Sequence, residues 1–388
     1  MPERQVLICN AGSTSLKFRL FDMPRESVVL SAKVERIGSE HALFQIEAAD
    51  REKITEERPI LDYEAGIALF IEAAAAAGVI LNPDVIGYKT VLAEGFFGIH
   101  KVDDAVKDAM RAWLDVAPAH NGPYLAAMST MEAAWPDVPQ VAVFETYFHR
   151  TIPEARRLYS IPLEWSETYG IKRYGYHGTS HRYVAETLRQ RYADASHIIS
   201  CHLGGSGSVS AILNGESIHN SFGFSLQTGV MHNNRSGQID AFIFPFLMRR
   251  GLTAGEIEET LAKKSGILGV SGISGDMRDI EEQLDLDPRA NLAFDVYVEY
   301  LLREIGSAYA VLGGLTDVAF TGGIGENSPL LRAEVISRLG HMGLTLAEDK
   351  NLEGLDQVRI DNGDVRIHVI AANEELIVAR EAYRCQFS

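Results

Sequence analysis

A strand–turn–strand pattern occurs twice in this chain, about half its length apart, and it constrains the fold more than any other feature. The first copy, from Val6 to Asp22, reads VLICNAGSTSLKFRLFD, and the second, from Ile198 to Ile218, reads IISCHLGGSGSVSAILNGESI. In the first copy an apolar run enters a turn rich in glycine and serine, and an alternating strand pattern leaves it. In the second copy Cys201-His202-Leu203-Gly204 aligns on Cys9-Asn10-Ala11-Gly12. Two halves that begin with the same hairpin predict duplicated α/β domains facing one another across a cleft.

The turns of this pattern have a composition that suits phosphate. The first turn, Asn10 to Ser15, carries three hydroxyls, and Lys17 follows it. Gly12 allows close backbone approach, and hydroxyls with an ammonium can surround an anion, although such a hairpin alone is commonly only a turn. A third glycine-rich turn, Thr321 to Asn327, follows an apolar run and precedes a predicted helix that contains Leu331. A strand that delivers such a turn to a helix N-terminus suits a nucleotide, so the three turns together favour phosphate binding.

Composition limits the class of protein. A chain of 388 residues with 46% hydrophobic residues can form two domains or one large duplicated domain. Its net charge of -17 argues against nucleic acid or an anionic membrane as a partner, and a small anionic substrate would need local basic residues. Its three cysteines, in no CxxC pair, fit a reduced cytoplasmic enzyme without structural zinc or disulfides. No signal peptide is expected, and the alanine-rich stretch from Ala65 to Leu81, interrupted by Glu72, predicts a packed helix rather than a membrane span.

Five motifs carry a resemblance to a known family. NAGSTSLKF, YGYHGTSHRYV, SGISGDMRDI, FTGGIGENS and NEEL occur in this order, as in the acetate and propionate kinase family. The chain resembles that family from about Val6 to the C-terminal helix, most weakly between Glu26 and Pro59. Sugar kinases, actins and heat-shock chaperones share the fold but lack HGTSH and FTGGIGEN.

The resemblance implies an α/β fold of two duplicated ribonuclease-H-like domains, the actin-like ATPase fold, flanking a nucleotide cleft. The first domain is expected to span residues 1–150 and to be completed by a C-terminal helix at 373–388. The second domain, 151–372, is expected to hold the adenosine site and the dimer interface. The implied activity is reversible phosphoryl transfer from ATP, with Mg²⁺ or Mn²⁺, to a short-chain carboxylate such as acetate, by a cytoplasmic homodimer.

Phosphoryl transfer from ATP to a carboxylate requires positively charged side chains near the reacting groups. A carboxylate that attacks the γ-phosphate of ATP needs in-line positioning and positive charge near the equatorial oxygens. Arg235 in NNRSGQID resembles the family arginine that binds carboxylate and stabilises the transferring group, a role suited to a planar fork of donors. His177 in GYHGTSH resembles the family histidine proposed to contact the phosphoryl group, and Lys89 in GYKTV is the third candidate. The competing interpretations are a surface arginine, a structural histidine and a surface lysine, and His181 is expected only to cap or pack.

The same resemblance assigns the nucleotide and metal residues. It matches the first phosphate hairpin at Asn10, Ser13, Ser15 and Lys17. The second hairpin, expected to hold the β- and γ-phosphates, supplies His202, Gly204, Gly205, Ser206 and Gly207. The adenosine side is matched by Asp276, Met277, Arg278, Gly323, Ile324 and Asn327. Asn10, Glu145 and Glu374 are expected to hold magnesium, with Glu375 as an alternative that is an ordinary carboxylate in the first turn of a helix.

Three positions depart from the family pattern. The arginine of GHRVVHGG is Lys89 here, which keeps the charge but loses bidentate geometry. The aspartate of FDTAFH is Glu145, one methylene longer. The asparagine of HLGNG is Gly205, which removes a side-chain contact to phosphate. Together these departures argue against high acetate turnover.

The expected substrate pocket also differs from the family. The family's valine, leucine, phenylalanine and proline correspond to Val91, Ala119, Tyr176 and Leu226, next to Lys89. Alanine opens space, leucine offers flexible apolar surface, and the tyrosine hydroxyl needs a partner if it is buried. The changes favour a substrate longer than acetate, such as propionate or butyrate, or one with a polar substituent, unless neighbouring side chains refill the gap.

Two other functions compete. A sugar or polyol kinase on the same fold would need a base for the hydroxyl, and Glu145 could serve, but HGTSH and FTGGIGEN argue against it. A non-catalytic nucleotide-binding relative is the other alternative, because of the changes at Lys89, Glu145 and Gly205.

Overall fold

The computed structural model describes residues 3–12, 14–49, 51–116, 118–353, 358–361 and 363–387. The chain divides into two compact units, one made of Met1–Tyr147 with Asn373–Ser388 and the other of Phe148–Ala372. Each unit is built around one β-sheet, eight-stranded in the first and six-stranded in the second. The α/β class predicted from the sequence is therefore confirmed.

The first unit contains strands β1 (Arg4–Gly12), β2 (Ser15–Met23), β3 (Ser27–Glu35), β4 (Ser39–Ala48), β5 (Ile54–Ile60), β6 (Val85–Thr90), β7 (Ile99–Lys101) and β8 (Gln140–Phe144). Its helices are α1 (Tyr63–Ala76), α2 (Asp104–Ala112), α3 (Pro118–Ala134) and α15 (Glu374–Phe387), and the 3₁₀ helix η1 (Glu145–Thr151) leads out of it.

The second unit contains strands β9 (His197–Leu203), β10 (Gly207–Leu213), β11 (Glu216–Asn220), β12 (Asp317–Thr321), β13 (Val358–Arg359) and β14 (Arg366–Val369). Its first helices are α4 (Glu154–Arg157), α5 (Leu163–Tyr169), α6 (Gly178–Arg191), α7 (Ile243–Arg249), α8 (Ala254–Lys263) and α9 (Gly266–Ser271). Its remaining helices are α10 (Met277–Glu282), α11 (Pro288–Leu312), α12 (Gly322–Asn327), α13 (Pro329–Ser337), η2 (Gly340–Met342) and α14 (Glu348–Glu353).

The two sheets share one strand order at their centres. In the first sheet β1 and β2 are antiparallel, as are β2 and β3, whereas β6 pairs parallel with β1 and β8 pairs parallel with β6. In the second sheet β9, β10 and β11 form the antiparallel part, and β12 and β14 continue it in parallel. β9, which carries Cys201, thus holds the place that β1, with Cys9, holds in the first sheet. The duplication predicted from the two hairpins is therefore confirmed.

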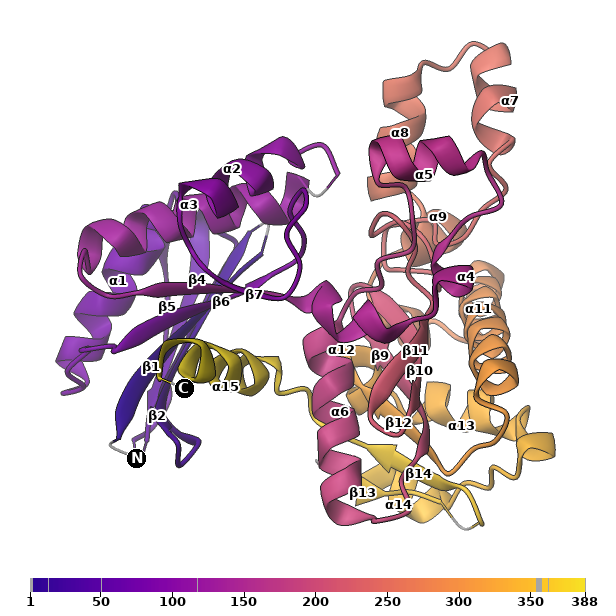
Figure 1. The fold of residues 1–388 in the computed structure, drawn as a ribbon. Helices are drawn as coiled ribbons and strands as arrows, with labels where there is room; N and C mark the ends of the chain where they lie inside the picture. The colour runs from indigo at the N-terminus through magenta and orange to yellow at the C-terminus, as the bar shows by residue number, and fades with distance from the viewer. Residues whose placement is uncertain are drawn as a thin grey trace. The chain divides into compact units, whose positions relative to one another are not determined.

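Helices cover both faces of the first sheet. Helices α1, α2 and α3 lie above the sheet in Figure 1, and α15 lies below it against β1, β6 and β8. Phe18 of β2 stacks on Phe70 of α1 within the upper core. On the lower face a Cβ at Gly87 would come within 2.8 Å of Ile8 and 3.1 Å of Val378, so only glycine allows α15 to pack this closely. The final helix of the chain thereby completes the first unit.

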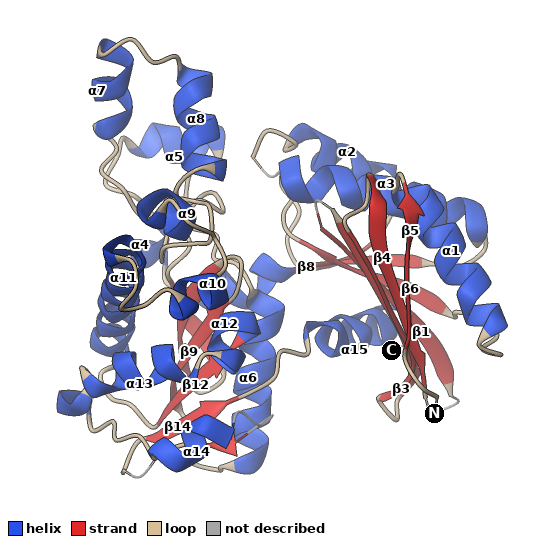
Figure 2. Ribbon diagram, turned by 180° about the vertical axis from the view of Figure 1, so that it is seen from behind, coloured by secondary structure: helices blue, strands red, loops and turns tan. Residues whose placement is uncertain are grey.

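Helices also cover both faces of the second sheet. The 25-residue helix α11 packs on β9 and β10, and α6 packs on β9 from the opposite side, as Figures 1 and 2 show. The α11 face is an apolar core that includes Cys201 and Val209. The α6 face instead buries polar side chains, among them Ser200 and Ser208. This polar face is where the second unit holds several candidate site residues.

Local structure agrees with the sequence at some points and differs at others. The alanine-rich stretch is the packed helix α1, as predicted, and within the described residues no helix is long and apolar enough to cross a membrane. The first turn is shorter than expected, because Asn10 lies inside β1 and pairs with Lys17 of β2. The third glycine-rich segment is helical rather than a turn, because Gly322 takes a φ of 79° that lets α12 begin directly after β12.

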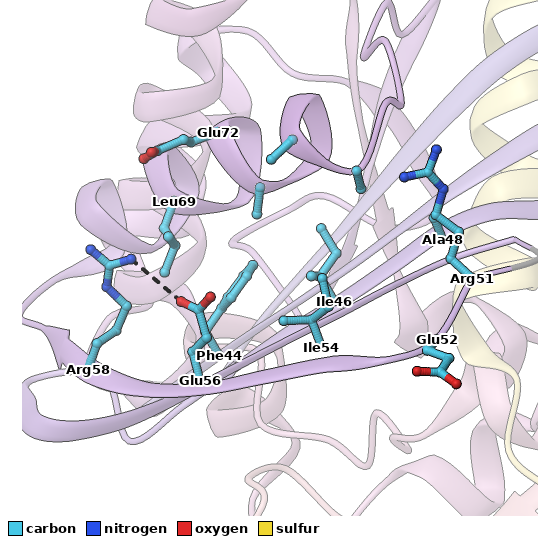
Figure 3. Close-up of a pocket in the computed structure, with 13 residues that line it drawn as sticks. Phe44, Ile46, Ala48, Arg51, Glu52, Ile54, Glu56, Arg58, Leu69 and Glu72 are labelled. Atoms are coloured by element: carbon cyan, nitrogen blue, oxygen red, sulfur yellow. Dashed lines mark ion pairs between the residues drawn. The ribbon is translucent and has the colours of Figure 1, made fainter.

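The first unit also has a hollow of about 240 Å³ between β4, β5 and α1. Figure 3 shows its apolar floor, formed by residues such as Phe44, Ile46 and Leu69, and the Arg58–Glu56 ion pair of 3.7 Å at its side. No candidate site residue is among the described residues that line it. The hollow lies at the β5 edge of the sheet, whereas the polar candidates lie on β1, β6 and beyond β8.

Candidate active site

The carboxyl ends of three parallel strands bring the candidates of the first unit together. Asn10 lies near the end of β1, Lys89 near the end of β6, and Glu145 directly after β8. Glu374 joins them from the first turn of α15. The carboxyl edge of parallel strands is where α/β folds bind ligands, because loops rather than pleated strands surround it.

Lys89 is held by two carboxylates. Its Nζ lies 2.8 Å from Glu374 Oε2 and 3.5 Å from Glu145 Oε2, and its side chain is only 14% exposed. Burial of the ammonium lowers its pKa, but the charges of Glu374 and Glu145 outweigh burial and raise the pKa well above its ordinary value. Lys89 is therefore a permanent positive charge between two acids. The sequence predicted the charge but not that both predicted metal ligands would contact it.

Tyr124 is a site residue that the sequence did not reveal. It reaches from α3 and donates a hydrogen bond of 2.8 Å from its hydroxyl to Asn10 Oδ1. Burial raises the pKa of this hydroxyl well above its ordinary value, so it stays a donor. The bond fixes the amide of Asn10 at the end of β1. No local motif announces this contact, since Asn10 and Tyr124 are far apart in the sequence.

The oxygen donors of the first unit suit magnesium. Asn10, Glu145 and Glu374 offer amide and carboxylate oxygens, and Mg²⁺ is usually held by one or two carboxylates together with phosphates and water. The described residues contain no group of three or more histidine, cysteine, aspartate or glutamate side chains that could hold a metal by themselves. The donor chemistry of Asn10, Glu145 and Glu374 fits a magnesium ion whose remaining ligands are phosphate and water.

The other predicted residues of the first phosphate hairpin are Ser13, Ser15 and Lys17. A Cβ at Gly12 would lie 2.8 Å from Ser15 Oγ, so glycine lets that hydroxyl fold over the end of β1. Lys17 is exposed on β2, and Ser13 lies outside the described residues.

The second unit surrounds His177 with histidine and serine side chains. His177 precedes α6 with a φ of 55°, a left-handed conformation, and its ring stacks on that of His202 with centroids 4.1 Å apart. Its Nδ1 lies 2.9 Å from Ser208 Oγ and its Nε2 lies 3.1 Å from Ser206 Oγ. His202 Nδ1 in turn lies 2.7 Å from Ser180 Oγ. A strained backbone and a ring held on both nitrogens point to a functional rather than a space-filling histidine.

A single hydroxyl couples His177 to His181. Ser208 Oγ also lies 2.8 Å from His181 Nε2, and His181 Nδ1 lies 2.9 Å from Ser200 Oγ. Burial lowers the pKa of His181 well below its ordinary value, so this ring is neutral. Ser208 has one proton to donate, and therefore only one of the two rings receives it while the other must donate to Ser208. If His177 carries its proton on Nε2, His181 must carry its own on Nε2. The sequence assigned His181 only a capping or packing role and missed this coupling.

Arg235 lies on a loop that His232 fixes to the second hairpin. Its Nη1 donates to Leu226 O at 2.7 Å, and burial lowers its pKa to about 10, which leaves it charged at neutral pH. His232 Nδ1 accepts from the backbone N–H of Gly207 at 3.1 Å, and its Nε2 lies 3.2 Å from Thr228 O. Burial, with the charge of Arg235, lowers the pKa of His232 to about 3, so the ring stays an acceptor for Gly207. Sequence reasoning missed His232.

A hollow of about 510 Å³ in the second unit collects the predicted nucleotide residues. Its lining includes most of the predicted phosphate-turn and adenosine residues, namely Gly204, Gly205, Asp276, Met277, Arg278, Gly323, Ile324 and Asn327. Asn233, Glu281 and Ser328 complete it and were not predicted. Three segments that are distant in the sequence thus share one space, of a size that suits a nucleotide base and sugar.

Two sets of side-chain hydrogen bonds hold segments that line this hollow, one at residues 276–278 and one at the end of α12. Asp276 accepts from Arg278 Nε at 3.0 Å and from Arg278 Nη2 at 2.6 Å, which orients the exposed guanidinium. Arg332 is fully buried and donates to Gly325 O at 2.8 Å and Glu326 O at 2.9 Å, which satisfies two carbonyls at the end of α12. Sequence reasoning missed Arg332, because an arginine in an amphipathic helix usually faces water.

The expected substrate-pocket residues divide between the units. Val91 is buried in the first unit, and Ala119 lies in α3 with its side chain outside the described part of the chain. Tyr176 and Leu226 are buried in the second unit. The Tyr176 hydroxyl donates to Phe224 O at 2.7 Å, so a protein group satisfies it.

Comparison with known proteins identifies the family. The chain matches the Acetokinase family over residues 5–380. It is 42% identical to an acetate kinase of Symbiobacterium thermophilum over 97% of this chain and 98% of the relative. Its structure matches an acetate kinase of Porphyromonas gingivalis with a TM-score of 0.87 at 31% identity, covering 99% of this chain and 100% of that one. A propionate kinase of Francisella tularensis matches with a TM-score of 0.91 at 30% identity, covering 98% and 99%. With these motifs on this duplicated fold, the chain belongs to the acetokinase family.

Proposed function

We propose that this chain transfers the γ-phosphoryl group of ATP to a small carboxylate, most simply acetate, giving ADP and an acyl phosphate. An oxygen of the carboxylate forms a bond to the γ-phosphorus, and the bond from that phosphorus to the bridging oxygen of ADP breaks. The hollow of the second unit, lined by three predicted nucleotide segments, carries this proposal in a member of the acetokinase family. A carboxylate is already ionised at neutral pH, so the reaction needs no base.

In this proposal Arg235 and His177 bind the phosphoryl group while it is transferred. The guanidinium of Arg235 uses one donor on Leu226 O and offers further donors in the same plane to carboxylate and phosphoryl oxygens. Ser208 holds the ring of His177 at Nδ1, and the Nε2–H exchanges Ser206 Oγ, 3.1 Å away in the structure, for an equatorial oxygen of the phosphoryl group. Both groups act on charge that spreads over the phosphoryl oxygens in the transition state.

Asn10, Glu145 and Glu374 hold magnesium in this proposal, directly or through water. A bound ion would supply positive charge close to the phosphate oxygens. Lys89 contacts both carboxylates, which lowers the net negative charge that ATP meets there. Ser15 and Lys17 of the first hairpin provide a hydroxyl and an ammonium for phosphate.

The substrate in this proposal is acetate or a slightly longer acid. Leu226 supplies flexible apolar surface, and Tyr176 adds no unmet polar group because its hydroxyl is bonded to Phe224 O. One methylene changes the difference in transition-state binding free energy between two acids by only about 1–3 kcal/mol. We therefore expect a shifted preference among the acids rather than exclusion of acetate.

A homodimer is the proposed assembly, with the second unit at its interface. Helices α5 and α7, together at one end of that unit in Figures 1 and 2, carry exposed apolar side chains. Tyr169 is 65% exposed and Phe242 is 77% exposed, and Trp165 and Phe246 are exposed beside them in sequence. Large exposed apolar side chains in one region of a unit favour association. Sedimentation should give twice the 42.7 kDa chain mass, and Phe242→Glu should give monomers.

We also propose a cytoplasmic location, which the three free thiols support.

ADP release tests the activity and its alternatives. Purified protein with ATP and Mg²⁺ should release ADP with acetate, propionate or butyrate and should not respond to glucose or glycerol. A response to sugars or polyols alone would establish the competing kinase class. ATP binding without ADP release on any acceptor would establish a non-catalytic relative.

A further inference from the structure

Glycines mark the phosphate end of the hollow of about 510 Å³ in the second unit. Gly204 and Gly205 of the second hairpin line it together with Gly323 of α12. A Cβ at Gly204 would lie 3.8 Å from the backbone nitrogen of Gly323, so the hairpin and the start of α12 are neighbours. In the proposed function this hairpin binds phosphate, and the base of the nucleotide therefore lies further along the hollow.

Helices α10 and α12 lead from this end of the hollow to a common point. The segment before α10 lies near the hairpin, because a Cβ at Gly275 would be 3.0 Å from Asn233 O, and the N–H of Asn233 donates to Gly205 O at 3.2 Å. At their other ends the two helices meet, where Ser328 Oγ donates to Glu281 Oε1. A rise of about 1.5 Å per residue puts this meeting point roughly 6–7 Å from the helix starts.

Each helix lines the hollow with an apolar residue and, four positions later, with a polar one. On α10 these residues are Met277 and Glu281. At the end of α12 they are Ile324 and Ser328, and the N–H of Ser328 donates to Ile324 O at 2.9 Å, which continues the helical geometry. Residues four apart share a helix face. The apolar pair therefore suits the faces of a base, and the polar pair suits its far edge.

One oxygen of Glu281 is engaged and the other is not. Ser328 Oγ accepts from the N–H of Leu331 at 3.1 Å, so its single proton goes to Glu281 Oε1. Among the described residues Glu281 Oε2 has no hydrogen-bond partner. Burial raises the pKa of Glu281, whereas the Ser328 hydroxyl and the charge of Arg332 favour the carboxylate form. The polar end of the hollow thus offers one acceptor with a fixed orientation.

A single carboxylate acceptor distinguishes between bases. Adenine carries an amino group at position 6, which donates, whereas guanine and hypoxanthine carry an oxygen there, which only accepts. Guanine could instead give its N1–H and its 2-amino group to two carboxylate oxygens. Glu281 has only one oxygen left for that purpose, because Ser328 occupies Oε1. The arrangement therefore favours a base with one exocyclic amine.

We propose that Glu281 selects the base of the nucleotide by accepting a hydrogen bond from the 6-amino group of adenine at Oε2. This inference rests on the proposed function, because it assigns a specificity residue to the same nucleotide site. Its position at the end away from the phosphate hairpin fits a carboxylate, which the negative charge of the phosphates would otherwise repel.

Calorimetry with ADP and IDP tests the proposal, because the two nucleotides differ only in the amine or oxygen at position 6 and in the proton on N1. The wild type should bind ADP at least tenfold more tightly than IDP, since the exchange replaces a hydrogen bond to a charged group by two facing acceptors. In Glu281→Gln the Ser328 proton holds the amide oxygen and turns the amide nitrogen to the base, so the preference should be lost or reversed. Glu282→Gln, at the exposed neighbour, loses the same charge and should keep the wild-type ratio.

Three results would overturn the proposal: wild-type Kd values for ADP and IDP within about twofold, tighter binding of GDP than of ADP, or a wild-type ratio in folded Glu281→Gln. If unfolding curves show that this variant does not fold, the wild type decides with purine riboside diphosphate, which has no substituent at position 6. That ligand should bind more weakly than ADP and more tightly than IDP, and any other order contradicts the proposal. These binding results are separate from a failure of the proposed function, which would appear as protein that selects ADP but makes no acyl phosphate from ATP.

Discussion

At the scale of single residues, the site combines charges that the sequence predicted with partners that it did not. Lys89, Glu145 and Glu374 were each predicted, but from separate motifs. The structure places the Lys89 ammonium in contact with both carboxylates, and it adds Tyr124 as the partner of Asn10. A motif fixes which residue stands at a strand end, whereas these contacts depend on α15 and α3 packing against the sheet.

Lys89 should contribute charge to carboxylate binding, but less than arginine would. Lys89→Arg should lower the KM for acetate, because five donors can reach the two acids and still engage the substrate, whereas an ammonium has three. Lys89→Met should raise that KM at least tenfold, since about 1.4 kcal/mol of lost interaction already gives that factor. Steady-state kinetics at saturating ATP measures both. Equal constants in all three proteins would show that Lys89 serves only its two carboxylate partners.

Glu145 should be required for the use of magnesium. It is 3% exposed and has Lys89 as a cationic neighbour, so Glu145→Ala removes a buried carboxylate. Turnover at saturating ATP should fall by about two orders of magnitude or more, because metal charge supplies several kcal/mol in such reactions. Glu145→Asp, which restores the usual family residue, should keep at least wild-type turnover. A titration of Mg²⁺ should show a higher half-saturating concentration in Glu145→Gln. Turnover in Glu145→Ala within about twofold of the wild type would contradict this role.

At the scale of elements, the polar face of the second sheet explains how α6 presents His177. Ser200 and His202 alternate on β9, and Ser208 and Ser210 alternate on β10, so the strand period of two directs all four toward one face. This alternation is visible in SCHLGGSGSVS and could have predicted a polar face beneath the histidine motif. Which serine meets which ring could not be predicted, because it depends on how α6 lies on the strands.

Ser208 should position His177 through its bond to the ring. Ser208→Ala removes the hydroxyl shared by His177 and His181, and kcat should fall about tenfold, as expected for one lost hydrogen bond between polar groups. The pH profile of kcat should shift as well, because the two rings no longer share a proton donor. Ser210→Ala is the matched control, since Ser210 lies on the same face but donates to His219 O. If the pH profile of kcat in Ser208→Ala is the same as that in Ser210→Ala, Ser208 does not position His177.

At the scale of the whole molecule, the duplication was the most predictable feature and the fine structure of the site the least. The two hairpins predicted the two duplicated sheets, and the hairpin, glycine-rich and SGISGDMRDI motifs together predicted most of the residues that line the hollow of about 510 Å³ in the second unit. The helical form of α12 was missed, because glycine-rich sequence favours turns until a close contact, here of Gly322 with Leu203, selects a helix start. His232 and Asn233 were missed because each lies against residues from other segments, and Arg332 was missed because an arginine in an amphipathic helix usually faces water.

Buried histidines should make the second unit sensitive to acid. Burial lowers the pKa of His149 to about 4 and that of His232 to about 3, and it lowers the pKa of His181 well below its ordinary value. The unfolded chain takes up these protons near pH 6.5 while the folded unit does not, so their contribution is complete above that pH and is lost as the pH falls toward 4. Each group should lower the unfolding free energy by on the order of 1 kcal/mol per pH unit in this window. Urea unfolding at pH 7, 6 and 5 should show the fall, and His149→Gln should reduce its slope. Equal stability at pH 7 and pH 5 would contradict the assignment of neutral rings.

The most direct test of the whole account is to trap its product. Wild-type protein with ATP, Mg²⁺ and millimolar acetate or propionate should convert added hydroxylamine to the acyl hydroxamate, at a rate that rises with carboxylate concentration. Arg235→Ala should lower this rate by two orders of magnitude or more, since a fork of donors on the transferring group is lost. Hydroxamate in the wild type above that control is the predicted result. Folded wild-type protein that yields no more hydroxamate than Arg235→Ala with any of these acids would contradict the assignment of carboxylate kinase activity to this chain.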